Sequence, residues 1–308
     1  MEYEDELENE DIDLLELIMS DSNATNQYLV FHGSNNEIYG INVSKVVEIL
    51  VYKNLEMVKN GASDSLIQAT AQIRDNMATI INFDEWFGNE VLHESEYEYV
   101  MVTGFGGHYL AMMTRGVEYI VNIDSKNMQD NSKNNPKTNF ISKIKLNGKE
   151  QLCTMIDCDK LLIDVFKDGV GKNNIELIND KYIVKSNKII FFADDSRFIR
   201  KLVESLFDKL QLRYKSFKNG QELLDELKNT KADEIALIIT DLEMPVMDGF
   251  HLLKELKELE DYSDINKLVH TNMSNFIVEN TLIDLGTAMI MPKINMEELA
   301  VGIKKYIK

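Results

Sequence analysis

Four short polar segments in the C-terminal part of the sequence carry residue types suited to phosphoryl chemistry. Each follows an apolar run, and together they supply Asp194 with Asp195, then Asp241, Thr271 and Lys293. Clustered carboxylates repel one another and need a cation, and an all-oxygen site of this kind suits Mg²⁺. An exposed carboxylate can also attack a phosphoryl group as a nucleophile. Each residue alone is an ordinary turn, cap or surface residue, so the hypothesis depends on the fold bringing them together.

The elements that must position these residues alternate between strands and helices. Continuous apolar runs such as 189–193 and 235–240 are typical of strands buried on both faces of a parallel sheet. Apolar residues at helical spacing follow, for example over 199–210. Five strands and five helices predict a doubly wound α/β domain over 188–308. Ligands of such sheets bind at the carboxyl ends of the strands, where three aspartates, a hydroxyl group and a lysine would converge.

Residues 24–165 follow a different pattern. Runs of roughly four to eight β-prone residues, separated by turn signals, predict an all-β sandwich or barrel. Two short helical stretches are expected near 43–49 and 84–87. The segment 124–138 is rich in Asn, Lys, Asp and Ser, which predicts an exposed loop. Residues 166–187 show little periodicity and are assigned to a linker.

Two cysteines, Cys153 and Cys158, lie along a probable strand of the all-β part and lack a second pair. Core thiols are therefore a better interpretation than a metal site, and two cysteines cannot build a disulfide framework, which favours a reducing cytoplasm. No apolar run reaches the roughly 18 residues of a membrane span. The acidic N-terminus is unlike a secretory signal. We expect a cytoplasmic protein without direct membrane insertion.

The net charge of −19 arises from 52 acidic and 33 basic residues and is unevenly distributed. Residues 1–21 contain ten acidic residues and no basic one, so 1–23 are assigned to an acidic tail. A solvated tail is the simpler interpretation. The alternative is a short amphipathic helix for a partner or for the body of the protein, built on Leu14, Leu15, Leu17 and Ile18. The acidic balance argues against binding to nucleic acid or to anionic membrane surfaces.

The C-terminal domain resembles a response-regulator receiver domain, a (βα)₅ fold with a flavodoxin-like parallel sheet. The matching segments are FFADDS (191–196), IITDLEMPVMDGF (238–250), LVHTN (268–272) and MIMPK (289–293). The resemblance implies that Asp241 accepts phosphate from a histidine kinase in the presence of Mg²⁺.

The same resemblance implies roles for the neighbouring residues. Asp194 and Asp195, with Asp241 and the backbone carbonyl of Glu243, would hold the metal. The residues that sense the phosphoryl group would be Thr271 and Lys293. This chain departs from the family pattern at two positions: Ile290 replaces an aromatic switch residue, and Asn272 replaces a small residue.

The N-terminal domain resembles the CheW adaptor of bacterial chemotaxis, a fold of two small β-barrels that bridges chemoreceptors and the chemotaxis histidine kinase. The matching segments are NQYLVFHGSNNEIYGINVSKVVEIL (26–50), QIRDNMATIINFDEWFG (72–88), YVMVTGFGGHYLAMMTRGVEYI (99–120) and LCTMIDCDKLL (152–162). Arg74 matches a family position associated with partner contacts. In the family a glycine follows this arginine, and here Asp75 replaces that glycine. Glu48 matches a family acidic position.

A CheW-like domain followed by a receiver domain is similar to the CheV family. This resemblance implies a non-enzymatic scaffold that links chemoreceptors to the histidine kinase and is modulated by phosphorylation of Asp241. Two alternatives stay open within this architecture: a phosphate sink, and a constitutive adaptor whose receiver does not signal. A phosphohydrolase with an aspartyl nucleophile is a third. Such enzymes generally place a second acid two residues after a nucleophile on the first strand, and here Ser196 stands two residues after Asp194.

Overall fold

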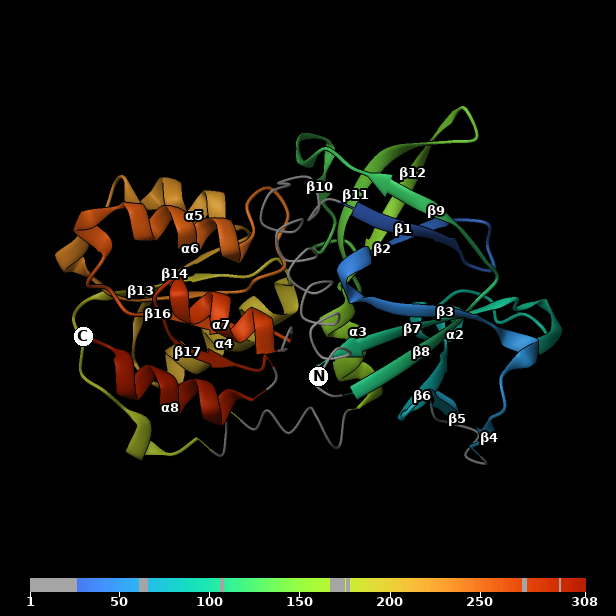
Figure 1. The fold of residues 1–308 in the computed structure, drawn as a ribbon, viewed down its shortest axis with the longest axis horizontal. Helices are drawn as coiled ribbons and strands as arrows, with labels where there is room; N and C mark the ends of the chain where they lie inside the picture. The colour runs from blue at the N-terminus through green and yellow to red at the C-terminus, as the bar shows by residue number, and fades with distance from the viewer. Residues whose placement is uncertain are drawn as a thin grey trace, which may run out of the picture. The chain divides into compact units, whose positions relative to one another are not determined.

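The structure is a computed structural model, and it describes residues 27–60, 66–105, 108–166, 175, 178–272, 276–293 and 295–308. The chain divides into two compact units between residues 169 and 170, and each is described by itself. Figure 1 labels their helices and strands. The predictions for the acidic tail, and for much of the linker, lie outside the described residues.

The first unit contains two six-stranded sheets. One sheet has the order β10-β11-β12-β2-β1-β9 and the other has the order β3-β7-β8-β6-β5-β4. The strands of the first are β1 (Gln27–His32), β2 (Ile38–Asn42), β9 (Gly116–Asn122), β10 (Gln129–Asp130), β11 (Thr138–Leu146) and β12 (Lys149–Ile156). The strands of the second are β3 (Val46–Val51), β4 (Val58–Lys59), β5 (Ile67–Ile73), β6 (Asn76–Asn82), β7 (Tyr99–Phe105) and β8 (His108–Thr114). Each sheet has its own hydrophobic core, in agreement with the predicted double β-barrel.

Several local predictions for this unit need correction. The helix expected near 43–49 is wrong, because only Val43–Lys45 (η2) forms a 3₁₀ turn before β3 begins. Half-buried and exposed side chains alternate along β3, which is the period of a strand at a sheet surface. The predicted loop 124–138 contains the 3₁₀ turn η5 (Ser125–Asn127) and the short strand β10. The short helix expected near 84–87 is confirmed as α2 (Phe83–Phe87).

The two cysteines are free and buried, as predicted for core thiols. Cys153 lies in β12, and its burial raises the pKa of the thiol to about 12. Cys158 is not on a strand, because it is the first residue of the helix α3 (Cys158–Val165). The side chain of Asp157 caps this helix by accepting a hydrogen bond from the main-chain nitrogen of Lys160 at 3.0 Å.

The second unit contains a five-stranded parallel sheet of order β14-β13-β15-β16-β17. This is the flavodoxin-like order 2-1-3-4-5. The strands are β13 (Ile189–Ala193), β14 (Arg213–Phe217), β15 (Ile235–Thr240), β16 (Lys267–His270) and β17 (Thr287–Met291). The helices are α4 (Arg197–Lys209), α5 (Gly220–Leu227), α6 (Gly249–Glu258), α7 (Phe276–Asp284) and α8 (Met296–Tyr306). The predicted (βα)₅ architecture is confirmed.

Two helical layers cover this sheet. On one face, α5 and α6 pack on β13 and β15 through one hydrophobic cluster, and α6 and α7 share a second cluster with β16 and β17. On the other face, α4 contacts α8. Part of the predicted linker packs on α8: Tyr182, in the 3₁₀ turn η7 (Asp180–Tyr182), donates its hydroxyl to Glu297 Oε1 at 2.7 Å. Within the described ranges, no helix combines the length and apolar character that crossing a membrane would need.

Candidate functional site

The acidic pair follows the central strand β13. Asp194 is completely buried. Its main-chain nitrogen donates to the carbonyl of Phe217 at 3.1 Å, which ties it to the end of β14. Its Oδ1 accepts from the main-chain nitrogen of Ser196 at 2.9 Å. Ser196 in turn caps α4 by accepting from the nitrogen of Ile199. The strand end and the helix start therefore fix the direction of the Asp194 carboxylate.

Asp241 follows β15, whose six residues are all buried. Its main-chain nitrogen donates to the carbonyl of Ala193 at 2.8 Å, which joins the ends of β15 and β13. The main-chain nitrogen of Leu242 donates to Asp241 Oδ1 at 2.7 Å. The hydroxyl of Thr240 donates to the Asp241 carbonyl at 2.8 Å. Asp241 is thus held through its main-chain nitrogen, its carbonyl oxygen and one carboxylate oxygen.

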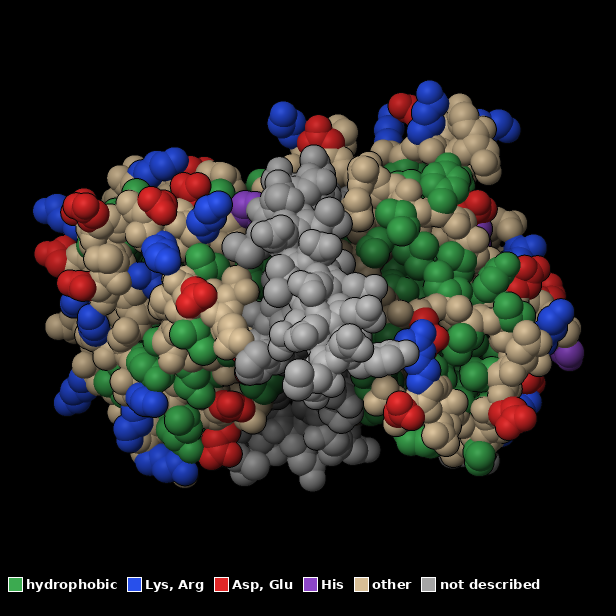
Figure 2. Space-filling view, viewed as in Figure 1, with side chains coloured by type: hydrophobic (Ala, Val, Ile, Leu, Met, Phe, Trp, Pro, Cys, Tyr) green, Lys and Arg blue, Asp and Glu red, His purple; other side chains and the backbone are tan. Residues whose placement is uncertain are grey.

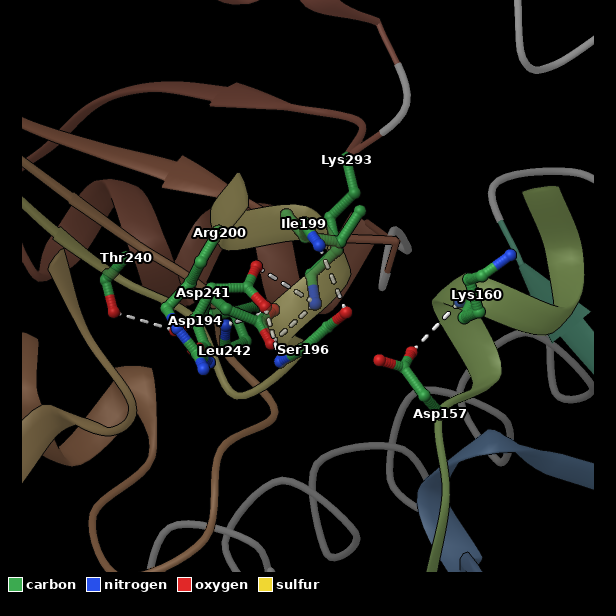
Figure 3. A network of polar contacts seen from close by, with 10 residues as sticks. All are labelled: Asp157, Lys160, Asp194, Ser196, Ile199, Arg200, Thr240, Asp241, Leu242 and Lys293. Carbon is green, nitrogen blue, oxygen red and sulfur yellow. Dashed lines mark hydrogen bonds and ion pairs between the residues drawn. The ribbon is translucent and has the colours of Figure 1, made fainter. Parts of the chain in front are cut away.

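Lys293 follows β17 and brings the two acidic positions together. Its Nζ lies 2.8 Å from Asp241 Oδ2 and 3.3 Å from Asp194 Oδ2. Only 1% of Lys293 is exposed, and both carboxylates are fully buried. Figure 3 shows the three side chains pointing toward one another. The convergence predicted from the strand order is present in the structure.

The other three predicted residues lie at the same edge of the sheet. Asp195 is half-buried, and a carboxylate oxygen of Asp195 lies within 4.8 Å of one of Asp194. Thr271 follows β16 and is buried; its main-chain nitrogen donates to the carbonyl of Met291 at 2.9 Å, which ties it to the end of β17. Glu243 is half-buried in the loop after β15.

The donor set fits a hard divalent cation. Three carboxylates gather at the strand ends, and Lys293 offsets one of their negative charges. Carboxylate and carbonyl oxygens are the ligands that Mg²⁺ and similar cations prefer. Burial of uncompensated charge is unfavourable, so a cation at Asp194, Asp195 and Asp241 would relieve the remaining repulsion.

Two residues that the sequence analysis did not single out support the site. The main-chain nitrogen of Gly249 donates to the carbonyl of Leu242 at 3.0 Å, and a Cβ at this position would lie 2.1 Å from the carbonyl oxygen of Asp241. Arg200 donates to the main-chain carbonyl of Asp194. The sequence signal for Gly249 was a glycine at the start of a helix. The signal for Arg200 was a cation near a helix N-terminus, where cations are disfavoured.

The loop after Asp241 contains a strained residue. Val246 has a φ of 73° and is 45% exposed. A β-branched residue is disfavoured in the left-handed region by about 1–2 kcal/mol. We expect Val246→Asn to raise the free energy of unfolding of the α/β unit by about 1 kcal/mol, because asparagine tolerates this conformation. Urea unfolding followed by helical circular dichroism checks this, and an unchanged or lower stability would contradict it.

His251 makes the stability of this loop depend on pH. Its Nδ1 lies 2.8 Å from Asp248 Oδ2, and this hydrogen bond raises the pKa of His251 above its usual value of 6.5. Because the pKa of His251 is higher in the folded state, its contribution to the free energy of unfolding is fully present below the unfolded-state pKa. This contribution is lost as pH rises through the folded-state pKa. Between about pH 6 and pH 8, wild type should lose more stability than His251→Gln. Parallel pH profiles in thermal unfolding would argue against this coupling.

The structure pairs the two residues singled out in the all-β unit. Arg74 Nη2 lies 3.2 Å from Glu48 Oε2, with side-chain exposures of 72% and 15%. Arg74 is the first residue of the two-residue turn between β5 and β6 and has a φ of 51°. Glu48 lies on β3. Arg74 thus pairs with a carboxylate on β3 and still presents most of its side chain to solvent.

An exposed apolar surface lies on the same unit. Figure 2 shows hydrophobic side chains gathered over β1, β9 and β3. Val47 and Ile49 on β3 and Tyr119 and Ile120 on β9 are between 39% and 52% exposed. Contiguous apolar surface on a folded domain commonly marks a contact with another protein.

Comparison with known proteins places both units. The CheW-like domain model matches residues 27–166, and the response regulator receiver domain model matches residues 190–303. Chemotaxis protein CheV1 of Helicobacter pylori is 26% identical over 92% of this chain and 93% of its own length. Chemotaxis protein CheV2 of the same organism is 25% identical over 88% and 90%. Sensor histidine kinase CheAY, also from H. pylori, is 22% identical over 90% of this chain and 34% of its own length.

The order of the two matched domains agrees with the order of the two structural units. The similarity to both CheV proteins runs through the all-β unit and the α/β unit alike. The chain therefore joins a CheW-like domain to a response-regulator receiver domain, and over most of its length it is similar to CheV proteins.

Proposed function

We propose that this chain is a chemotaxis coupling protein of the cytoplasm whose CheW-like domain links chemoreceptors to the chemotaxis histidine kinase, and whose receiver domain modulates that link when Asp241 is phosphorylated. One observation carries the regulatory half: Lys293 contacts both Asp194 and Asp241 at the carboxyl edge of the receiver sheet. A CheW-like domain in the same chain supplies the coupling half.

The phosphoryl transfer can be written with the residues of this site. A carboxylate oxygen of Asp241 attacks the phosphorus of a phosphohistidine on the kinase. The new P–O bond forms as the P–N bond breaks, and the electron pair of that bond returns to the imidazole. Lys293 supplies positive charge beside the phosphoryl oxygens, and the Thr271 hydroxyl can donate a hydrogen bond to one of them. Such transfers depend mainly on positioning and charge neutralisation.

Mg²⁺ is the cation we propose for the site. Asp194, Asp195 and Asp241, with the backbone carbonyl of Glu243, would hold it, and it would neutralise charge on the transferring phosphoryl group. The protein's own part is to hold these oxygens in place. Strand ends, the cap of α4 and the Thr240 hydroxyl do this for the two fully buried aspartates.

Partner contacts are proposed on the CheW-like domain. The exposed Arg74 guanidinium, oriented by Glu48, can form a charged contact. The apolar surface that includes Val47, Ile49 and Ile120 can bury hydrophobic side chains of a receptor or kinase. The two features suit a protein partner with both an acidic and an apolar element.

A phosphate sink is a second candidate, and Ile290 is the observation that favours it. Ile290 lies in β17 and packs against the cluster between α6 and α7. An aliphatic residue at this position lacks the ring of the family's aromatic switch. The phosphorylated receiver would then drain phosphate from the kinase without changing partner affinity.

Phosphotransfer followed by receptor-complex pulldown tests the proposal. The full chain is incubated with ³²P-labelled chemotaxis kinase and Mg²⁺, and then with receptor-containing membranes. We expect label on this chain, a receptor–kinase complex that contains it, and different affinities for the two phosphorylation states, since a modification shifts nothing without differential binding. Label with equal affinities would support the phosphate sink. Absence of label would contradict the regulatory half of the proposal, and absence of the complex would contradict the coupling half.

A further inference from the structure

A buried arginine supports the acidic pair from behind. Nη1 of Arg200 lies 2.6 Å from the main-chain carbonyl oxygen of Asp194, and only 9% of the residue is exposed. Figure 3 shows the Arg200 side chain running from α4 toward Asp194. The main-chain nitrogen of Arg200 donates to the carbonyl of Ser196 at 3.0 Å. The arginine is therefore fixed at both its main chain and its guanidinium group.

Helix stability does not account for this placement. Arg200 lies three residues after the first residue of α4, where the partial positive charge of the helix N-terminus disfavours a cation. The guanidinium is always charged, and taking it out of water is unfavourable unless it is compensated. Lys201, the next residue, shows the usual arrangement of a surface cation, with a 67% exposed side chain paired with Glu204.

Arg200 contacts the peptide group that joins Asp194 and Asp195. Asp194 is held through its main-chain nitrogen by Phe217, through Oδ1 by Ser196 and through Oδ2 by Lys293. The carbonyl that Arg200 contacts belongs to the peptide between Asp194 and Asp195. Rotation of this peptide would turn the two side chains away from a shared direction. Arg200 opposes that rotation for both acids at once.

We propose that Arg200 is a positioning residue for divalent-cation binding at Asp194 and Asp195. The inference rests on the proposed function, because it concerns the same site. A ligand set that already points in the required direction loses less freedom when the cation binds. Residues that orient metal ligands typically contribute 10–100-fold to metal affinity. Removal of Arg200 should therefore weaken binding even though it removes a positive charge.

Titration calorimetry of the full chain with MgCl₂ tests this. We expect Arg200→Met to raise the Kd for Mg²⁺ about tenfold. Arg200→Lys should also weaken binding, because a single ammonium does not reproduce the planar guanidinium fork. Lys201→Met is the matched control, since it removes one positive charge from the same helix, and its Kd should equal that of wild type.

The sign of the effect separates the alternatives. A purely electrostatic role would tighten Mg²⁺ binding in Arg200→Met, and a purely structural role would lower the unfolding temperature without moving the Kd; either outcome overturns the proposal. Arg200→Lys keeps the positive charge and provides the test if Arg200→Met does not fold. An unchanged Kd for Mg²⁺ in Arg200→Lys would also overturn the proposal. Failure of wild type to bind Mg²⁺ would instead contradict the proposed metal site itself.

Discussion

Replacement of Asp241 by asparagine is expected to abolish phosphorylation of this chain by the phosphorylated chemotaxis kinase. The amide has the same shape, and its oxygen can still accept the hydrogen bond from the Leu242 nitrogen. It lacks the negative oxygen that would attack phosphorus, and the ion pair with Lys293 is lost. Removal of a nucleophile commonly lowers rates by 10³-fold or more. Label transfer from ³²P-kinase, measured at saturating Mg²⁺, should fall by at least about this factor.

Asp248→Asn is the matched control for this experiment. Asp248 is also a buried carboxylate of the loop after β15, but it caps α6 by accepting from the His251 nitrogen. Asparagine caps helices as well as aspartate does, so this variant should keep its label. Undiminished label on Asp241→Asn would assign phosphorylation to another residue. Both variants should retain receptor and kinase binding, because Arg74 and the apolar surface lie on the CheW-like domain.

The receiver half was predictable because its signals are local and strong. The strands 189–193 and 235–240 are apolar runs that are typical of a sheet covered on both faces. Once the strand order is set, the residues after β13, β15 and β17 must meet at one edge. The convergence of Asp194, Asp241 and Lys293 therefore followed from the topology and needed no knowledge of side-chain contacts.

The CheW-like half was less predictable because several of its strands, such as β3 and β9, are only partly buried. Along β3 half-buried and exposed residues alternate, and its first residues follow a 3₁₀ turn, so the sequence predicts a helix near 43–49 where the structure has mainly a strand. In β5 the sequence IQATAQI mixes small and polar residues, so its apolar signal is weak. The helix α3 follows β12 almost directly, so the sequence does not separate Cys158, the first residue of the helix, from the strand that holds Cys153.

The supporting contacts of the site depend on tertiary structure. Arg200 approaches the Asp194 carbonyl only because α4 turns back over the end of β13. The strain at Val246 depends on the path of a loop that no sequence pattern specified. The pairing of Arg74 with Glu48 joins the β5–β6 turn to β3 across the sheet. Spacing in the sequence carries no information about these distances.

Substitution of Gly249 by alanine is expected to destabilise the receiver domain by on the order of 3 kcal/mol or more. An ideal Cβ would lie 2.1 Å from the carbonyl oxygen of Asp241 and 2.9 Å from its carbonyl carbon. Both are main-chain atoms, so relief requires moving either α6 or the end of β15. The single tryptophan, Trp86, reports on the CheW-like domain, so urea unfolding followed by helical circular dichroism can be compared with a tryptophan signal that should not change.

Gly302→Ala separates this clash from a general intolerance of glycine substitution. A Cβ at Gly302 in α8 would approach the sulfur of Met291 at 2.7 Å, but a flexible methionine side chain can move. Alanine also favours a helix interior by about 1 kcal/mol over glycine, so Gly302→Ala should stay within about 1 kcal/mol of wild type. Equal stability of the two variants would contradict the clash. The Asp241 carbonyl is one side of this clash. Gly249→Ala should therefore also lower label transfer under conditions where the domain remains folded, which ties the stability of this turn to the geometry of the phosphorylation site.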